Sequence, residues 1–297
     1  MTNFSLKFHS GSASSEIHGP DYLVEKNITL VTMNHRLGPF GFLSLDDPTL
    51  NVPGNAGFKD QRLALQWVQK NIANFGGDPS KVTLFGFSAG ASSTHFHMMS
   101  PSSKGLLHRG IIMGGNVIQN GVGYIPRLQW AQRLAERLGF NSTNETAILE
   151  FLEQADPVEL VIEQHNILPP ESELAGLGFA FGPTQEPYET EGTFLIEDLL
   201  PMVQNAWGNE IEFMLGQTSN EVLGVAITLR AVPDFLPAFA DFQNYIPRQL
   251  DVERNTEKSL KYAEMIKRTY YGILEPTITN IDGMMFVSFI KTFLKKS

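Results

Sequence analysis

VTLFGFSAGA, residues Val82–Ala91, is the stretch that decides the fold. Its first four residues are rich in β-branched and aromatic side chains and predict a strand, and a helix is expected from about Ala89. Gly-x-Ser-x-Gly between a strand and a helix is typical of a serine nucleophile on a sharp turn, where Gly86 and Gly90 leave room for the backbone. Ser88 is therefore the candidate nucleophile, and the backbone N–H of Ala89 is the candidate oxyanion donor. The bare pattern also occurs in structural turns, and its context favours the catalytic interpretation.

The segments around this stretch predict a parallel sheet. Ile28–Met33 has the composition of a buried strand, and Gly110–Met113 is a further short strand candidate. Pro39–Gly54 is punctuated by proline and glycine and predicts a loop, whereas Lys59–Phe75 has apolar residues at helical spacing. Strands that alternate with helices in this way indicate an α/β fold with right-handed crossovers.

The second half of the chain is predicted to be more helical. Its expected elements are the helices Arg127–Leu138, Thr146–Gln154 with Asn144 as N-cap, Lys258–Tyr271 and Met284–Leu294, the strand Ile211–Gly216 and the loop Gly176–Pro187. No linker separates two domains, so we expect one domain over residues 1–297. Within it, residues 1–125 would form the core that carries the nucleophile, and residues 126–297 the more helical part.

Composition narrows the possible functions. The 297 residues include 42% hydrophobic and 18% charged side chains, which is typical of a globular protein. The net charge of −10 disfavours binding to nucleic acid, and the absence of cysteine excludes disulfides, thiol catalysis and cysteine-ligated zinc. No apolar run is long enough to span a membrane, and the first fifteen residues do not resemble a signal peptide. These features weakly favour the cytoplasm; secretion remains possible if the natural chain starts upstream.

A longer resemblance identifies a family. Asn55–Phe85, which leads into the Gly-x-Ser-x-Gly motif, resembles the segment before the nucleophile in type-B carboxylesterases, the family of cholinesterases and insect esterases. Asn34–Phe42 and Gly105–Gly110 continue the resemblance, and the residue before the serine, often glutamate in the family, is Phe87 here. The resemblance implies an α/β-hydrolase fold, mainly a parallel sheet with helices on both faces, incomplete at both termini. It also implies hydrolysis of a small-molecule carboxylic ester, without metal or cofactor.

The resemblance also implies a catalytic acid. The family places a glutamate just beyond a strand, in a Gly-x-x-x-x-Glu context, and Glu221 fits this pattern after Gly216. Its alternative interpretation is a solvated carboxylate at a helix start. Glu197, Asp198 and the acidic cluster at 186–191 compete with it, and we expect them to be surface charges.

Two parts of the family's catalytic machinery have no counterpart in the sequence. In the family, the catalytic histidine follows the acid. The seven histidines of this chain all precede Glu221: His9, His18, His35, His95, His97, His108 and His165. His95 and His97 lie two residues apart on the predicted nucleophile helix and are expected to be packing or surface residues. Thr2–Leu6 stands where the family has a glycine-rich oxyanion loop. The alternatives to a carboxylic-ester hydrolase are therefore a non-catalytic esterase-like binding or adhesion module and an incomplete gene product. The oligomeric state is left open.

Overall fold

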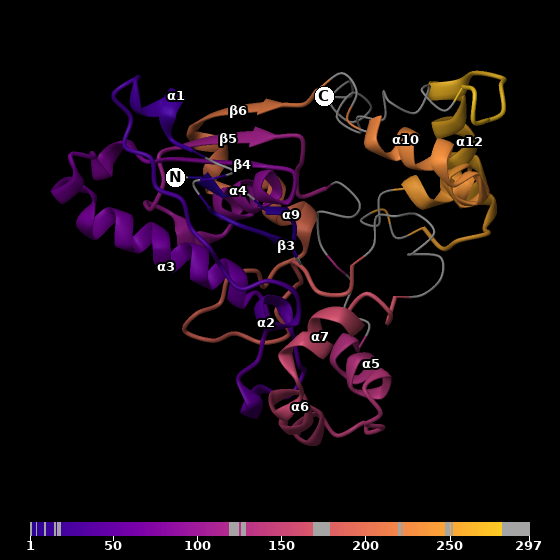
Figure 1. Cartoon of the computed structure of the whole chain (residues 1–297), viewed down its shortest axis with the longest axis horizontal. Coiled ribbons are helices and arrows are strands. Elements are labelled where there is room, and N and C mark those ends of the chain that lie inside the picture. Colours follow the sequence, from indigo (N-terminus) through magenta and orange to yellow (C-terminus); the bar gives the residue numbers. More distant parts are fainter. Residues whose placement is uncertain are drawn as a thin grey trace. The chain divides into compact units, whose positions relative to one another are not determined.

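A computed structural model describes residues 2, 3, 5–8, 10–14, 16, 19–118, 125, 129–168, 179–218, 221, 223–246, 250 and 252–280. The chain divides into two compact units, which are described separately (Figure 1). Unit 1 comprises residues 1–168 and 179–216, and unit 2 comprises residues 169–178 and 217–297. The single domain expected from the sequence stays a prediction.

A parallel sheet forms the centre of unit 1. Its strands are β1 (Thr2–Asn3), β4 (Thr83–Phe87), β5 (Arg109–Met113) and β6 (Glu212–Gly216), in the spatial order β1-β4-β5-β6. Every neighbouring pair is parallel, and the carboxyl ends of the three longer strands are in register, with Phe87 opposite Met113 and Met113 opposite Gly216. The predicted α/β architecture and the three predicted strands at these positions are confirmed. A separate antiparallel pair joins β2 (Ser5–Lys7) to β3 (Ser10–Gly11).

Two helices connect β4 to the rest of the fold, one before the strand and one after it. The helix α3 (Ala56–Asn71) precedes β4 and continues into a 3₁₀ turn at Ile72–Phe75, as the periodicity predicts. The helix α4 (Ala89–Met99) runs from β4 to β5 and packs against both strands. All its residues except His95 are buried, which explains its weak amphipathic pattern, because the helix has no face turned to solvent. Polar side chains such as Ser93 and Thr94 are buried with hydrogen bonds to backbone carbonyls of the helix.

The core of unit 1 has two apolar clusters. One lies between α3, α4 and the sheet and includes Leu65, Leu84 and Ile112. The other is larger and includes the aromatic rings of Phe58 and Phe194, which stack with their centroids 4.9 Å apart. Together they fix α4 on both sides.

Shorter helices surround this core. They are α1 (Asp21–Val24), α2 (Gly38–Phe42), α5 (Trp130–Arg137), α6 (Glu145–Gln154), α7 (Pro157–Glu163) and α9 (Leu199–Gln204). The predicted N-cap of α6 is confirmed, because the Asn144 side chain accepts a hydrogen bond from the Ala147 N–H at 3.0 Å.

Two local predictions are wrong. Ile28–Met33 forms no strand; among its residues only Thr32 makes an isolated bridge, so apolar composition alone did not provide a ladder. The predicted loop Pro39–Gly54 begins within α2 and contains a 3₁₀ turn at Pro48–Leu50. Pro39 lies in the first turn of α2, where a missing N–H costs nothing, so proline marked a helix start here rather than a loop.

Unit 2 is helical in its described part. It contains α10 (Leu223–Ala231), α11 (Leu236–Phe239) and α12 (Glu257–Tyr271), and the last of these was predicted. Thr256 and Ser259 form a capping box at the start of α12. The predicted helix Met284–Leu294 lies outside the described residues. None of the helices described in either unit has both the length and the apolar character needed to cross a bilayer.

Candidate active site

Ser88 occupies a strained turn between β4 and α4. Its backbone has φ 56° and ψ −119°, a conformation that L-residues rarely adopt. Such a conformation costs on the order of 1–3 kcal/mol and persists only where surrounding contacts impose it. The predicted strand–turn–helix geometry is confirmed.

Hydrogen bonds hold this turn to the neighbouring strand. The Ser88 N–H donates to the carbonyl oxygen of Met113, at the end of β5, over 2.9 Å. The Ser92 hydroxyl, one turn into α4, donates to the Asn116 carbonyl at 3.1 Å. The elbow is therefore attached to β5 and to the loop that follows it.

Glycines make the close approach possible. A Cβ on Gly86 would lie 2.2 Å from the carbonyl oxygen of Gly90, and a Cβ on Gly115 would lie 2.3 Å from that of Ser88. Both obstacles are backbone atoms, which cannot rotate away as a side chain would. Strand and helix thus touch backbone to backbone, as the motif predicted for Gly86 and Gly90.

The amino end of α4 provides a positive electrostatic environment. Ser88 is its N-cap residue and makes no side-chain capping hydrogen bond, so the cap leaves the first-turn N–H groups to other acceptors. The helix dipole adds partial positive charge at this end. Ala89 is fully buried at the first helical position, and its role as an oxyanion donor stays a prediction.

The residue next to Ser88 is apolar. Phe87 ends β4 and is 40% exposed. Its neighbour across the sheet is Met113. Apolar side chains therefore end both β4 and β5 beside the elbow.

The histidines on α4 are packing residues, as expected. His97 is fully buried, and burial lowers its pKa to about 3. Burial also lowers the pKa of His95 to about 4, and the Nδ1 atom of that residue has no hydrogen-bond partner among the described residues. Both imidazoles are consequently neutral near pH 7. His9 and His18 lie outside the described residues.

Glu221, the predicted acid, belongs to unit 2. It is exposed, and its Oε1 accepts a hydrogen bond from the Thr218 N–H at 2.5 Å. The strand that precedes it, β6, ends at Gly216, whose carbonyl accepts from the Gly114 N–H at 2.8 Å. The pairing of Glu221 with Ser88 through an imidazole remains a prediction.

One of the competing carboxylates was misjudged. Glu197, Asp198, Glu189 and Glu191 are exposed, as expected of surface charges. Glu186 instead is only 2% exposed. Its oxygens accept from the Asn55 amide at 3.1 Å, the Lys59 ammonium at 3.1 Å and the Phe194 N–H at 2.9 Å. These donors compensate for the loss of water, which a charge count along the sequence cannot reveal.

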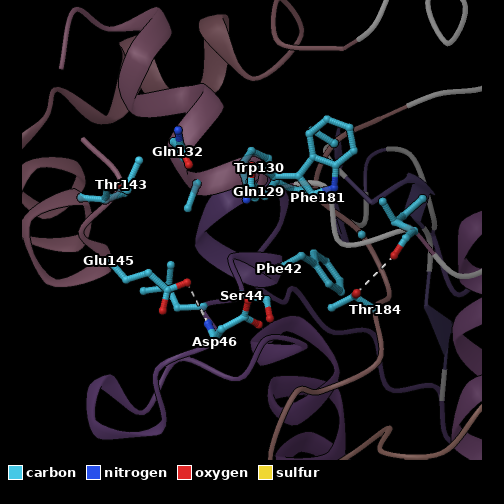
Figure 2. Close-up of a pocket in the computed structure, with 16 residues that line it drawn as sticks. Phe42, Ser44, Asp46, Gln129, Trp130, Gln132, Thr143, Glu145, Phe181 and Thr184 are labelled. Atoms are coloured by element: carbon cyan, nitrogen blue, oxygen red, sulfur yellow. Dashed lines mark hydrogen bonds between the residues drawn. The ribbon is translucent and has the colours of Figure 1, made fainter. Parts of the chain in front are cut away.

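A pocket of about 380 Å³ lies elsewhere in unit 1 (Figure 2). Phe42, Trp130 and Phe181 contribute aromatic walls, and Glu145 lies among its polar residues. The pocket does not include Ser88 or its neighbours at the elbow, and nothing in the sequence pattern predicted it. Within the part of the chain that the structure describes, no three histidine, aspartate or glutamate residues cluster as metal ligands.

Comparisons with known proteins agree with this geometry. The profile of the carboxylesterase family matches residues 5–284. Esterase B1 of Culex pipiens is 37% identical over 287 residues, which are 96% of this chain and 53% of that protein. Juvenile hormone esterase of Heliothis virescens is 34% identical over 268 residues, 89% of this chain and 46% of that protein. The chain spans about half the length of these curated relatives.

A solved structure is similar to the whole described architecture. The crystal structure of juvenile hormone esterase from Manduca sexta, with OTFP covalently attached, superposes with a TM-score of 0.74 at 26% identity. The match covers 96% of this chain and 53% of that one. The elbow at Ser88 therefore lies in a fold shared with esterases.

Proposed function

The chain belongs to the carboxylesterase family and has the α/β-hydrolase fold, and on this premise we propose that it is a serine carboxylic-ester hydrolase with Ser88 as its nucleophile. The observation that carries the proposal is the positive φ of Ser88 at the junction of β4 and α4. Strain at a non-glycine residue that ends a strand and starts a helix exposes the side chain at the edge of the sheet. A structural turn at this place would not require serine.

The proposed reaction starts at the Ser88 hydroxyl. Its Oγ attacks the ester carbonyl carbon while a base removes the hydroxyl proton, and the carbonyl oxygen becomes negatively charged. The Ala89 N–H, at the amino end of α4, is positioned in sequence to donate to that oxyanion. Collapse of the intermediate breaks the bond to the alkoxy group, which takes the proton back from the base and leaves as the neutral alcohol. Water then hydrolyses the acyl-enzyme and regenerates Ser88.

We propose Glu221 as the carboxylate that orients the base. Glutamate in this role fixes the tautomer of an imidazole and stabilises its charged form. Its support is its position five residues beyond Gly216, at the end of β6. In these 297 residues no histidine follows Glu221. We therefore expect slow turnover by this chain, because loss of the base leaves only the contributions of the oxyanion site and of binding.

The buried, hydrogen-bonded state of His97 favours a second candidate, a non-catalytic esterase-like binding module. His97 has both ring nitrogens in hydrogen bonds within the core, so it is unsuited to act as a substitute base. Under this proposal the chain would bind small carboxylic esters without turning them over. The presence of the serine nucleophile at position 88 argues against this second candidate.

The test compares the purified chain with its Ser88→Ala variant. A short-chain aryl ester measures turnover, and a fluorophosphonate followed by mass spectrometry measures covalent modification at Ser88. We expect slow modification of Ser88 in the parent, none in the variant, and turnover close to background in both. Rapid turnover that Ser88→Ala abolishes would show that an earlier histidine serves as base. No modification of a well-folded parent would support the binding module instead.

A further inference from the structure

The imidazole of His97 connects α4 to two other elements of unit 1. Its Nδ1 lies 2.8 Å from the hydroxyl of Ser103, in the 3₁₀ turn Pro101–Ser103. Its Nε2 lies 3.0 Å from the Oε1 of Gln61, on α3. All three side chains are fully buried. Since an amide oxygen can only accept, Nε2 carries the proton and Nδ1 accepts from Ser103.

The surroundings require this imidazole to be neutral. The rings of Phe58 and Phe194 pack edge-on against it, with centroids 6.1 Å and 5.0 Å away. Arg62 of α3 and His35, which precedes α2, are the charged or titratable groups whose fields act on it, and both oppose a positive charge. Burial has the same direction and lowers the pKa of His97.

The carboxyl end of α4 is held by further polar contacts. The hydroxyl of Ser100, the residue after α4, donates to the Phe194 carbonyl at 2.7 Å. The Ser100 carbonyl in turn accepts from the Trp207 indole N–H at 2.9 Å. These contacts hold the carboxyl end of α4 to other elements of unit 1, as the Ser92 bond to the Asn116 carbonyl holds its first turn.

Because a helix is a rigid element, contacts that fix the carboxyl end of α4 also fix the position of its amino end. His97 lies nine residues after Ser88, which corresponds to about 14 Å at a rise of 1.5 Å per residue. The backbone contact between Gly86 and Gly90 leaves no clearance for α4 to move toward β4. A displacement of about 1 Å at a reacting group can cost two orders of magnitude in rate.

We propose that His97 is a positioning residue for Ser88, which fixes the axial position of α4 through its bonds to Gln61 and Ser103. The proposal rests on the proposed function, because it assigns His97 a role at the same site. It predicts that the alignment of the helix amino end with residue 88 depends on three side chains that never touch a substrate.

A single cysteine at position 88 reports this alignment without any catalytic base. The chain has no cysteine, so Ser88→Cys introduces one thiol at the amino end of α4. A helix amino terminus lowers the pKa of a thiol below its usual value, about 8.5. The pKa is read from the pH dependence of thiolate absorbance, and reactivity from the rate of iodoacetamide alkylation near neutral pH. We expect a lowered thiol pKa in this parent variant.

Removal of either bond should weaken the effect. In the Ser88→Cys background, Ser103→Ala and Gln61→Met each remove one partner of the imidazole, and His97→Phe removes both bonds. We expect alkylation, measured at least one pH unit below the thiol pKa of the parent variant, to slow about three- to tenfold, because a rise of half to one pKa unit reduces the thiolate fraction there by that factor. Ser80→Ala, an exposed serine of unit 1, and His165→Phe, an exposed histidine, are the matched controls and should leave the rate unchanged.

The outcomes separate the two proposals. A lowered thiol pKa that stays the same in Ser103→Ala and Gln61→Met would overturn the role of His97 and leave the nucleophile assignment intact. An ordinary thiol pKa in Ser88→Cys alone would overturn both, because α4 would then not act on residue 88. The two milder variants keep the test decisive if His97→Phe fails to fold.

Discussion

The buried carboxylate of Glu186 allows a quantitative prediction. Glu186→Ala removes the acceptor of the Phe194 N–H and of the Lys59 ammonium. The Asn55 amide keeps its 2.7 Å bond to the Thr184 carbonyl, and the Lys59 side chain is 20% exposed and can reach water. The Phe194 and Leu195 N–H groups are the donors left buried without their acceptor. Each backbone N–H that is left buried without an acceptor costs about 1–3 kcal/mol, so the two together should lower the free energy of unfolding by about 2–6 kcal/mol. Glu186→Gln keeps one acceptor oxygen and should cost about 1–3 kcal/mol.

Tryptophan fluorescence suits this measurement. Trp67, Trp130 and Trp207 are the three tryptophans of the chain, and all lie in unit 1. Urea unfolding followed by fluorescence therefore reports on unit 1 alone. With a denaturant slope of about 2–3 kcal/mol per molar, Glu186→Ala should lower the midpoint by roughly 0.7–3 M.

The control is Glu189→Ala, which removes the same side chain from an exposed position three residues away. It should change the unfolding free energy by less than about 0.5 kcal/mol. A loss of less than about 1 kcal/mol in Glu186→Ala would refute the reasoning, because the carboxylate would then not be a buried centre of hydrogen bonds.

Three further predictions concern the elbow, a helix end and pH. Gly86→Ala should prevent the elbow from forming and abolish fluorophosphonate modification of Ser88, whereas Gly216→Ala, whose Cβ meets no described atom within 4 Å, should be tolerated. A modified and folded Gly86→Ala would contradict the close contact. Asn144→Ala removes the N-cap of α6 and should cost about 1 kcal/mol in urea unfolding; an unchanged midpoint would show that the cap contributes nothing. Unit 1 should lose stability as the pH falls from 7 to 5, because the pKa of His95 and of His97 is near 6.5 in the unfolded state but about 4 and about 3, respectively, in the folded state. A urea midpoint that stays constant over this pH range would contradict the buried neutral imidazoles.

The sequence predicted the helices and strands in which the spacing of apolar residues and the terminal residues match the side chains that are buried in the fold. The helix α3 has apolar residues at helical spacing, and the 3₁₀ turn that continues it is capped by Gly76, whose φ of 78° is the left-handed conformation that favours glycine. The strand β4 and the turn at Ser88 followed from one motif, because strand, glycines and helix occur in a fixed order there. Periodicity and caps act within a few residues, so they can be read without the rest of the fold.

Features that depend on distant partners were not predictable in the same way. Ile28–Met33 has strand composition, but a strand also needs a neighbour to pair with, which composition does not specify. Glu186 looked like one charge in an acidic surface run, and only its long-range donors make its burial possible. The position of Glu221 relative to Ser88 depends on the arrangement of two units, and it stays a prediction for the same reason.

The contacts around Glu186 also have a consequence for the time course of folding. The bonds that join Asn55 to Glu186 and Val52 to Tyr188 span 131 and 136 residues of chain. At a synthesis rate of about 5–20 residues per second, Asn55 leaves the ribosome roughly 7–26 s before Glu186. During this interval the Asn55 amide and the Lys59 ammonium group, at the amino end of α3, cannot yet donate hydrogen bonds to the Glu186 carboxylate, and the surrounding aromatic residues stay uncovered. Nascent chains of this protein should therefore depend on holding chaperones until the segment around Glu186 emerges, and slower translation upstream of it should lengthen that dependence.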